Sequence, residues 1–162
     1  MLARLPRSRV SYGATLGPHP LLLRALERRL AEADSSAHEN PARTAVVLAA
    51  AGSSDPGANA TIARLAAQWQ ARTGWFAVQP AYASAAEPSP AAAVAGLLRA
   101  GAPRVVVATY LLAPGLFADR IRQSTLAAGA AAVSPALGAC AEIADVLLDR
   151  FAQTGSHRRT AA

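Results

Sequence analysis

The stretch VVLAAAGSSDPGAN, residues 46–59, decides the fold. Its first three residues are apolar and the next are small, which is typical of a strand buried in a parallel sheet. The chain then turns polar at Ser53, Ser54 and Asp55, and Pro56 stands where a helix can begin. A strand, a small-residue turn and a helix N-terminus form a site for an anionic group, because free backbone N–H groups and the helix dipole point at it. The alternative is an ordinary turn in which Ser54 or Asp55 caps the helix.

The chain continues to alternate between strand and helix over residues 43–154. The predicted strands lie at residues 43–50, 75–81, 104–111 and 130–134, and the predicted helices at residues 58–72, 90–100, 116–128 and 139–153. Four strand–helix units in sequence imply an α/β domain with a four-stranded parallel sheet, right-handed crossovers and helices on both faces. The last helix is amphipathic, and we expect its apolar side chains to point inward: Ile143, Val146, Leu147 and Phe151.

The residues before this domain resemble the end of another strand–helix unit. We interpret residues 10–33 as a strand at 10–12 followed by a helix over 18–33, whose apolar face is made by Leu22, Leu26 and Leu30. Residues 34–42, with the sequence DSSAHENPA, are predicted to be a polar linker. The α/β domain is therefore expected to be preceded by one extra unit.

An internal repeat supports this interpretation. Shifting the chain by 121 residues places Leu16-Gly17 on Leu137-Gly138 and Arg29 on Arg150. The same shift superposes apolar positions of the two helices: Leu22 on Ile143, Leu26 on Leu147, and Leu30 on Phe151. Such a repeat indicates a duplicated protein in which only the last strand–helix unit of the first copy is present.

The formal net charge of +6 does not point to nucleic acid once the charges are located. Residues 1–9 and 155–162 are predicted to be disordered tails, and they contain Arg4, Arg7, Arg9, Arg158 and Arg159. The rest of the chain is nearly neutral and has no basic stripe with interleaved aromatic residues. Nucleic acid is therefore not an expected partner.

Other absences narrow the class further. Cys140 is the only cysteine of the sequence, which excludes an internal disulfide and a cysteine-rich metal site. The sequence contains no lysine, which excludes a Walker phosphate loop. No apolar run reaches the ~18 residues of a membrane span, and the first residues lack a signal-peptide pattern. We expect a cytoplasmic protein without a membrane partner.

The first motif carries a family resemblance. The predicted strand is followed by the pattern G-S-x-D-P-x-A-N, made by Gly52, Ser53, Asp55, Pro56, Ala58 and Asn59. This pattern resembles the first motif of the sirohydrochlorin chelatase family, the small class II chelatases that insert cobalt, iron or nickel into tetrapyrroles. The resemblance implies a chelatase-like, flavodoxin-like fold. In that family a histidine usually stands before the motif glycine and binds the metal, whereas this chain has Ala51 there.

Two further blocks follow in the order that the family has. Residues 80–89, PAYASAAEPS, place Ser84 where the family has a polar residue facing the metal. Residues 109–121, TYLLAPGLFADRI, resemble the third strand and its glycine loop, and Phe117 stands where many members have a second metal-binding histidine. The resemblance implies no metal ligand in this chain, and it implies substrate-binding roles for Gly52, Ser53, Ser84, Gly115 and Phe117.

Three carboxylates could serve as a base for the pyrrole protons: Glu87 and Asp55, and also Asp119 on the next helix. The alternative for Glu87, which precedes a proline, is a helix cap, and the alternative for Asp119 is a solvated first turn of a helix. The three histidines are expected at the surface, because they fall at a helix start, in the linker and in the tail: His19, His38 and His157.

Three functions remain open at this point. The first is a chelatase that takes Co²⁺ or Fe²⁺ as its substrate, with no tightly bound cofactor. The second is a degenerate half that lines the tetrapyrrole cleft without metal ligands, completed by a missing first repeat or by a second copy in a homodimer. The third is a non-catalytic flavodoxin-like module that binds another anionic ligand.

Overall fold

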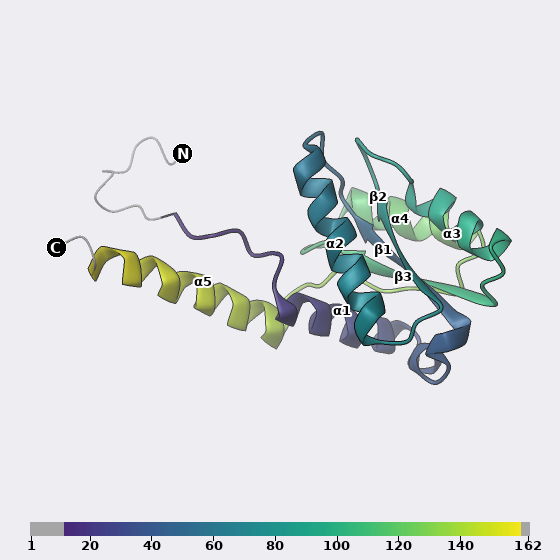
Figure 1. Cartoon of the computed structure of the whole chain (residues 1–162), viewed down its shortest axis with the longest axis horizontal. Helices are drawn as coiled ribbons and strands as arrows, with labels where there is room; N and C mark the ends of the chain where they lie inside the picture. The colour runs from purple at the N-terminus through teal and green to yellow at the C-terminus, as the bar shows by residue number, and fades with distance from the viewer. Residues whose placement is uncertain (1–11, 160–162) are drawn as a thin grey trace.

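The computed structural model describes the backbone of residues 12–159 and the side chains of residues 12–154. Its centre is a four-stranded sheet in the order β2-β1-β3-β4, and every pairing is parallel. The strands are β1 (Thr44–Ala50), β2 (Ala77–Tyr82), β3 (Arg104–Tyr110) and β4 (Ala132–Val133) (Figure 1). The predicted parallel α/β sheet is therefore confirmed, although β4 is only two residues long.

Within the described residues, five α-helices accompany the sheet. They are α1 (Pro20–Ala33), α2 (Pro56–Arg72), α3 (Pro90–Arg99), α4 (Leu116–Ala127) and α5 (Ala141–Arg159). Each agrees with a predicted helix to within a few residues at its start, and α5 extends into the segment predicted as a C-terminal tail. Within the described residues, no helix combines the length and apolar character needed to cross a membrane.

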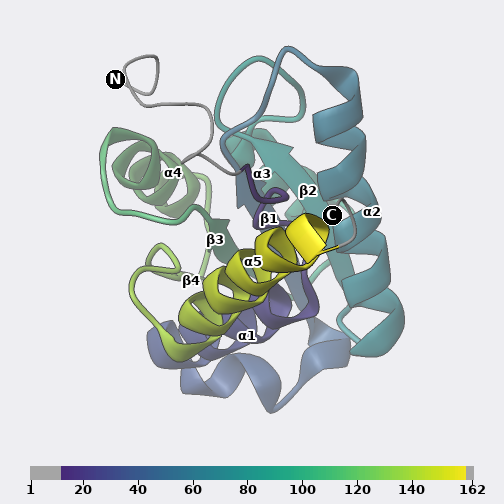
Figure 2. The same ribbon diagram turned by 90° about the vertical axis from the view of Figure 1, so that its left-hand side faces the viewer.

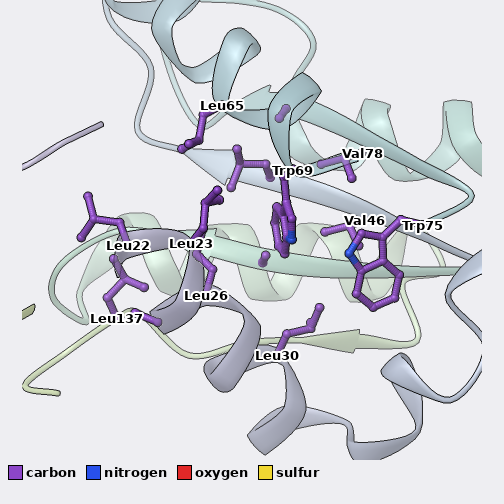
Figure 3. Close-up of a cluster of buried hydrophobic side chains, with 14 of the residues drawn as sticks. Leu22, Leu23, Leu26, Leu30, Val46, Leu65, Trp69, Trp75, Val78 and Leu137 are labelled. Atoms are coloured by element: carbon purple, nitrogen blue, oxygen red, sulfur yellow. The ribbon is translucent and has the colours of Figure 1, made fainter. Parts of the chain in front are cut away.

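Two apolar layers lie on opposite faces of the sheet, because successive strand residues point to opposite sides. Ala45, Val47 and Ala49 of β1 belong to a cluster with α3 and α4. Val46 and Leu48 belong to a second cluster with α1 and α2 (Figure 3). Helices on both faces of the sheet are thus confirmed.

The helix α1 belongs to the core of this domain. Leu23, Leu26 and Leu30 are buried in the same cluster as the sheet residues (Figure 3). The indole Nε1 of Trp69 on α2 donates a hydrogen bond to Glu27 of α1 over 3.0 Å. The assignment of residues 10–33 to a preceding repeat stays a prediction: residues 10 and 11 lie outside the described residues, and Tyr12 is in no strand.

The segment predicted as a linker folds onto the domain. Residues 35–38 and 41–43 form two short 3₁₀ helices, and Ala37 in the first of them is fully buried. Asp34 pairs with Arg104 at the start of β3. This segment therefore holds the end of α1 beside the sheet.

The prediction for α5 is half wrong. Ile143 and Val146 are buried as expected, but Leu147 and Phe151 are exposed. The physical reason is that α1 already covers the sheet face on which Leu147 and Phe151 of α5 would have to pack in order to be buried. Figures 1 and 2 show α5 leaving the domain beside the start of α1 and projecting away from the sheet.

A salt bridge joins the two helices at the base of α5. Arg28 of α1 donates to both carboxylate oxygens of Glu142 over 3.0 Å and 2.9 Å. The hydrogen bond from Arg28 lowers the pKa of Glu142 to about 2. The carboxylate therefore stays charged over the physiological pH range, and the base of α5 stays tied to α1.

We predict that Leu26→Ala lowers the free energy of unfolding by about 2–5 kcal/mol, because it removes a fully buried side chain between α1 and the sheet. Leu126→Ala, at an exposed position of α4, is the matched control and should change stability little. Urea unfolding followed by circular dichroism measures both. Equal losses in the two variants would show that α1 does not contribute to the core.

Candidate functional site

The loops of the three motifs meet at one edge of the sheet. Ala50, at the end of β1, lies opposite Tyr82 of β2 and Tyr110 of β3. Because the three strands are parallel and end level, the residues that follow them lie at the same carboxyl edge. This is where open parallel sheets bind their ligands.

A close backbone approach locks the first loop to the second. Gly52 has a φ of 85°, and a Cβ placed on it would lie 1.9 Å from the carbonyl oxygen of Ser84. The backbone N–H and the hydroxyl of Ser84 both donate to the carbonyl of Ala51, over 2.9 Å and 3.0 Å. The motif glycine is therefore required because no side chain fits between the two loops.

The amide of Asn59 clamps the same loop from the first turns of α2. Its Oδ1 accepts from the N–H of Ser53 over 3.0 Å, and its Nδ2 donates to the carbonyl of Ser53 over 2.7 Å. Tyr82 donates from its hydroxyl to the carbonyl of Asn59 over 2.9 Å, and burial raises the pKa of this phenol. The sequence had assigned no role to Tyr82, whose partner lies 23 residues earlier in the chain.

The three candidate carboxylates lie at or just before helix starts, and Asp119 is exposed in the first turn of α4. Asp55 caps α2, with Oδ1 accepting from the N–H of Gly57 over 2.9 Å. Glu87 accepts from the N–H of Ser89 over 2.8 Å, while Ser89 itself caps α3. The capping alternative for Asp55 is thus confirmed, and its negative charge at the start of α2 disfavours a second anion there. Catalytic roles for Glu87 and Asp55 stay predictions.

The third loop presents apolar side chains. Gly115 precedes α4 with a φ of 147° and open space around it. Phe117, in the first turn of α4, is half exposed, and Leu112 and Leu116 beside it are also exposed. Ser53 and Ser84 are joined through the loop at Ala51, whereas Phe117 stands apart from this network because α4 packs over β3 and β4. Convergence of all three on one cleft stays a prediction.

No metal-binding cluster forms within the described residues: no three side chains of His, Cys, Asp or Glu gather in one place. His19 is the N-cap of α1, where its Nδ1 accepts from the N–H of Leu21. The ring of His38 packs edge-on against Trp75 at a centroid distance of 5.0 Å. The other ring nitrogen of His19, Nε2, lies 3.7 Å from a carboxylate oxygen of Asp149 on α5.

An apolar hollow of about 450 Å³ lies beside this edge, and the sequence did not predict it. It lies on the α1 and α2 face of the sheet, between the starts of those helices and the end of β3. Its walls include Leu16, Leu22, Ile62, Leu65, Tyr110 and Leu137. Ser53, Ser84 and Phe117 are not among its lining residues, so the hollow and the motif loops are neighbouring features.

Together these features define a class: a parallel α/β domain whose strand-end loops are held by glycine turns at one open edge. The sequence profile of the CbiX family matches residues 45–154, which is more than half of the chain. The chain belongs to the CbiX family of sirohydrochlorin chelatases.

Individual relatives are distant and mostly longer. The chain is 27% identical over 120 residues to the sirohydrochlorin cobaltochelatase of Priestia megaterium, and it spans only 39% of that protein. SirB from Bacillus subtilis, solved with Fe³⁺, aligns with a TM-score of 0.80 at 23% identity, over 98% of this chain and 63% of its own. A CbiX protein of cobalamin biosynthesis from Marinobacter aquaeolei aligns with a TM-score of 0.55 at 20% identity, over 70% of this chain and 98% of its own.

We predict that Gly52→Ala destabilises the fold more than Gly101→Ala. Both glycines have positive φ, at 85° and 89°, so both variants carry the backbone strain of about 1–2 kcal/mol. Only at Gly52 does the new Cβ meet a backbone atom, since Gly101 faces open space. We expect Gly52→Ala to lose a further ~1–3 kcal/mol in urea unfolding. Equal losses would mean that the two loops separate without cost.

Proposed function

We propose that this chain is the half of a sirohydrochlorin chelatase that lines one wall of the tetrapyrrole cleft and supplies no imidazole to the metal. The observation that carries this proposal is that the loops at the sheet edge are held in place by the motif residues, whereas the two positions expected to bind metal have no side chain that can do so. Gly52 and Asn59 hold the first loop in place. Ala51 and Phe117, the two positions where the family resemblance implies histidines, have no donor atom in their side chains.

The hydroxyl groups at this edge are poor substitutes for imidazole. The Ser84 hydroxyl donates to the carbonyl of Ala51, and the Ser53 hydroxyl accepts from the N–H of Asp55. Both are therefore occupied in shaping the loops, and a serine hydroxyl binds divalent cobalt or iron weakly. The exposed ring of Phe117 is suited instead to packing on the flat face of a macrocycle.

The comparisons support a protein of two halves. The relative from Priestia megaterium is called a cobaltochelatase, and SirB has been solved with Fe³⁺ and, in a second structure, with cobalt. Both are considerably longer than the part that this chain matches. In this proposal the ligands for the substrate metal lie in the other half, and residues 10–33 are the end of that half. The base for the pyrrole protons, if this half supplies one, is Glu87 or Asp55.

We predict that the chain alone shifts the absorption spectrum of sirohydrochlorin but does not insert Co²⁺ into it. The double variant Ala51→His with Phe117→His offers one imidazole just after β1 and one in the first turn of α4, and should raise Co²⁺ affinity about tenfold or more. The matched control is Ala51→Gln with Phe117→Gln, which adds polar groups of similar size that bind cobalt poorly. Isothermal titration with Co²⁺ and absorbance spectra with sirohydrochlorin measure the two effects.

Each outcome selects one function. Robust metal insertion by the unmodified chain, unaffected by changes at Ala51 or Phe117, would contradict the proposal and place metal handling on other residues. An unchanged sirohydrochlorin spectrum would favour the alternative of a flavodoxin-like module for another anionic ligand. A spectral shift without insertion supports the proposed wall of the cleft.

A further inference from the structure

We propose that the apolar hollow beside the motif loops is a binding site for an uncharged, mainly apolar small molecule that carries one hydrogen-bond acceptor, such as a carbonyl oxygen. The donor that this acceptor meets is the hydroxyl of Tyr110. The site is separate from the tetrapyrrole cleft. The inference therefore goes beyond the proposed function and does not rest on it.

The floor of the hollow belongs to the core of the domain. Leu22, Leu65 and Leu137 line it and are at most 4% exposed. They are members of the cluster on the α1 and α2 face, and Figure 3 shows Leu22 and Leu137 at the end of this cluster opposite Trp75. The volume of about 450 Å³ lies within the range of about 300–1,000 Å³ that is typical of ligand pockets. An apolar molecule in the hollow therefore extends the core and is removed from water.

The walls of the hollow are tied down by hydrogen bonds from neighbouring elements. Arg150 of α5 holds the segment before α1, because it donates to the carbonyls of Thr15 and Leu16 over 2.8 Å and 3.3 Å. The end of β3 holds the segment before α5, because the N–H of Leu137 donates to the carbonyl of Leu111 over 2.8 Å. A hollow with fixed walls binds a ligand without the cost of ordering its own segments.

The lining leaves one polar group for a ligand. Among the described residues that line the hollow, none is charged, and the side-chain hydroxyls belong to Thr15, Thr61 and Tyr110. Thr15 donates to the carbonyl of Gly17 over 2.8 Å, and Thr61 donates to the carbonyl of Gly57 over 3.0 Å. Both threonine protons are therefore used within the protein, and the phenol remains.

The hydroxyl of Tyr110 is a donor that a ligand can reach. It has no hydrogen-bond partner in the part of the chain that the structure describes, where Trp75 Nε1 is the only unpartnered side-chain atom sealed from solvent. A Cβ at Gly17 would lie 2.5 Å from the phenol oxygen, so this glycine leaves the space in which the hydroxyl lies. Burial raises the pKa of Tyr110, which keeps the phenol protonated at neutral pH. An acceptor on an uncharged molecule fits this donor, because a buried charge would lack a partner here.

Two matched probes test the proposal. Benzophenone has one carbonyl acceptor, and diphenylmethane has the same two rings without it. We expect benzophenone to bind the full chain saturably and to shift the amide resonances of residues 15–17 and 58–65 in ¹H–¹⁵N spectra. Tyr110→Phe should weaken benzophenone binding about three- to tenfold, which is the effect of one hydrogen bond, and should leave diphenylmethane binding unchanged. Tyr12→Phe, at an exposed position, is the matched control and should change neither.

The remaining outcomes overturn the proposal. Absence of saturable binding, or equal weakening of both probes by Tyr110→Phe, would show that the phenol offers no donor to a ligand. Equal binding of 4-benzoylbenzoate would show that the hollow accepts an anion, through a cation outside the lining such as Arg64, which donates to Thr61.

Three further results would locate the probe or its competitor. Displacement of benzophenone by sirohydrochlorin would make the hollow part of the tetrapyrrole cleft and would contradict a separate site. Shifts that persist in Thr61→Trp, whose indole fills the hollow, would place the probe elsewhere on the surface. Binding that weakens as the protein concentration rises would identify a second copy of the chain as the occupant. Each of these results would contradict the proposal.

Discussion

The structure depends on covering one apolar sheet face with a helix that comes from before the sheet. Val46 and Leu48 of β1 and Val106 and Ala108 of β3 form a surface that water must not reach. In the chain, α1 covers this surface and the 3₁₀ turns after it tie its end to β3. The course of α5 follows from that: with the face occupied, the last helix keeps only a narrow contact with α1 and leaves the domain.

At the carboxyl edge of the sheet, the residues that hold the loops in shape are different from those at the positions expected to bind metal. Gly52 and Asn59 are used to hold backbone in place, and Tyr82 reaches over from β2 to secure the same loop. None of these roles involves a metal, so the loop keeps its shape whatever residue precedes the glycine. The fold of this loop therefore does not depend on an imidazole at position 51, which is compatible with the proposed half that supplies no metal ligand.

Most of the fold could be predicted from local patterns. The apolar run at 104–111 and the small-residue turn after Leu48 identify two of the strands, and Asp55 and Pro56 mark the start of α2. The fate of α5 could not be predicted in this way, because amphipathicity says which side of a helix is apolar but not what covers it. The apolar hollow lined by Tyr110 and Leu137 could not be predicted either, because its walls come from segments far apart in the chain.

The strand–helix repeat of the sequence and the folded domain do not have the same boundaries: they differ by one helix. The family profile begins at residue 45, yet the core is closed by residues 20–33, which lie before it. During synthesis α1 leaves the ribosome before the sheet that it covers, and β3 of that sheet follows about seventy residues later. Its leucines must stay uncovered or find a transient partner over that interval, and this long-range closure makes the domain a slower folder than its strand–helix alternation would indicate.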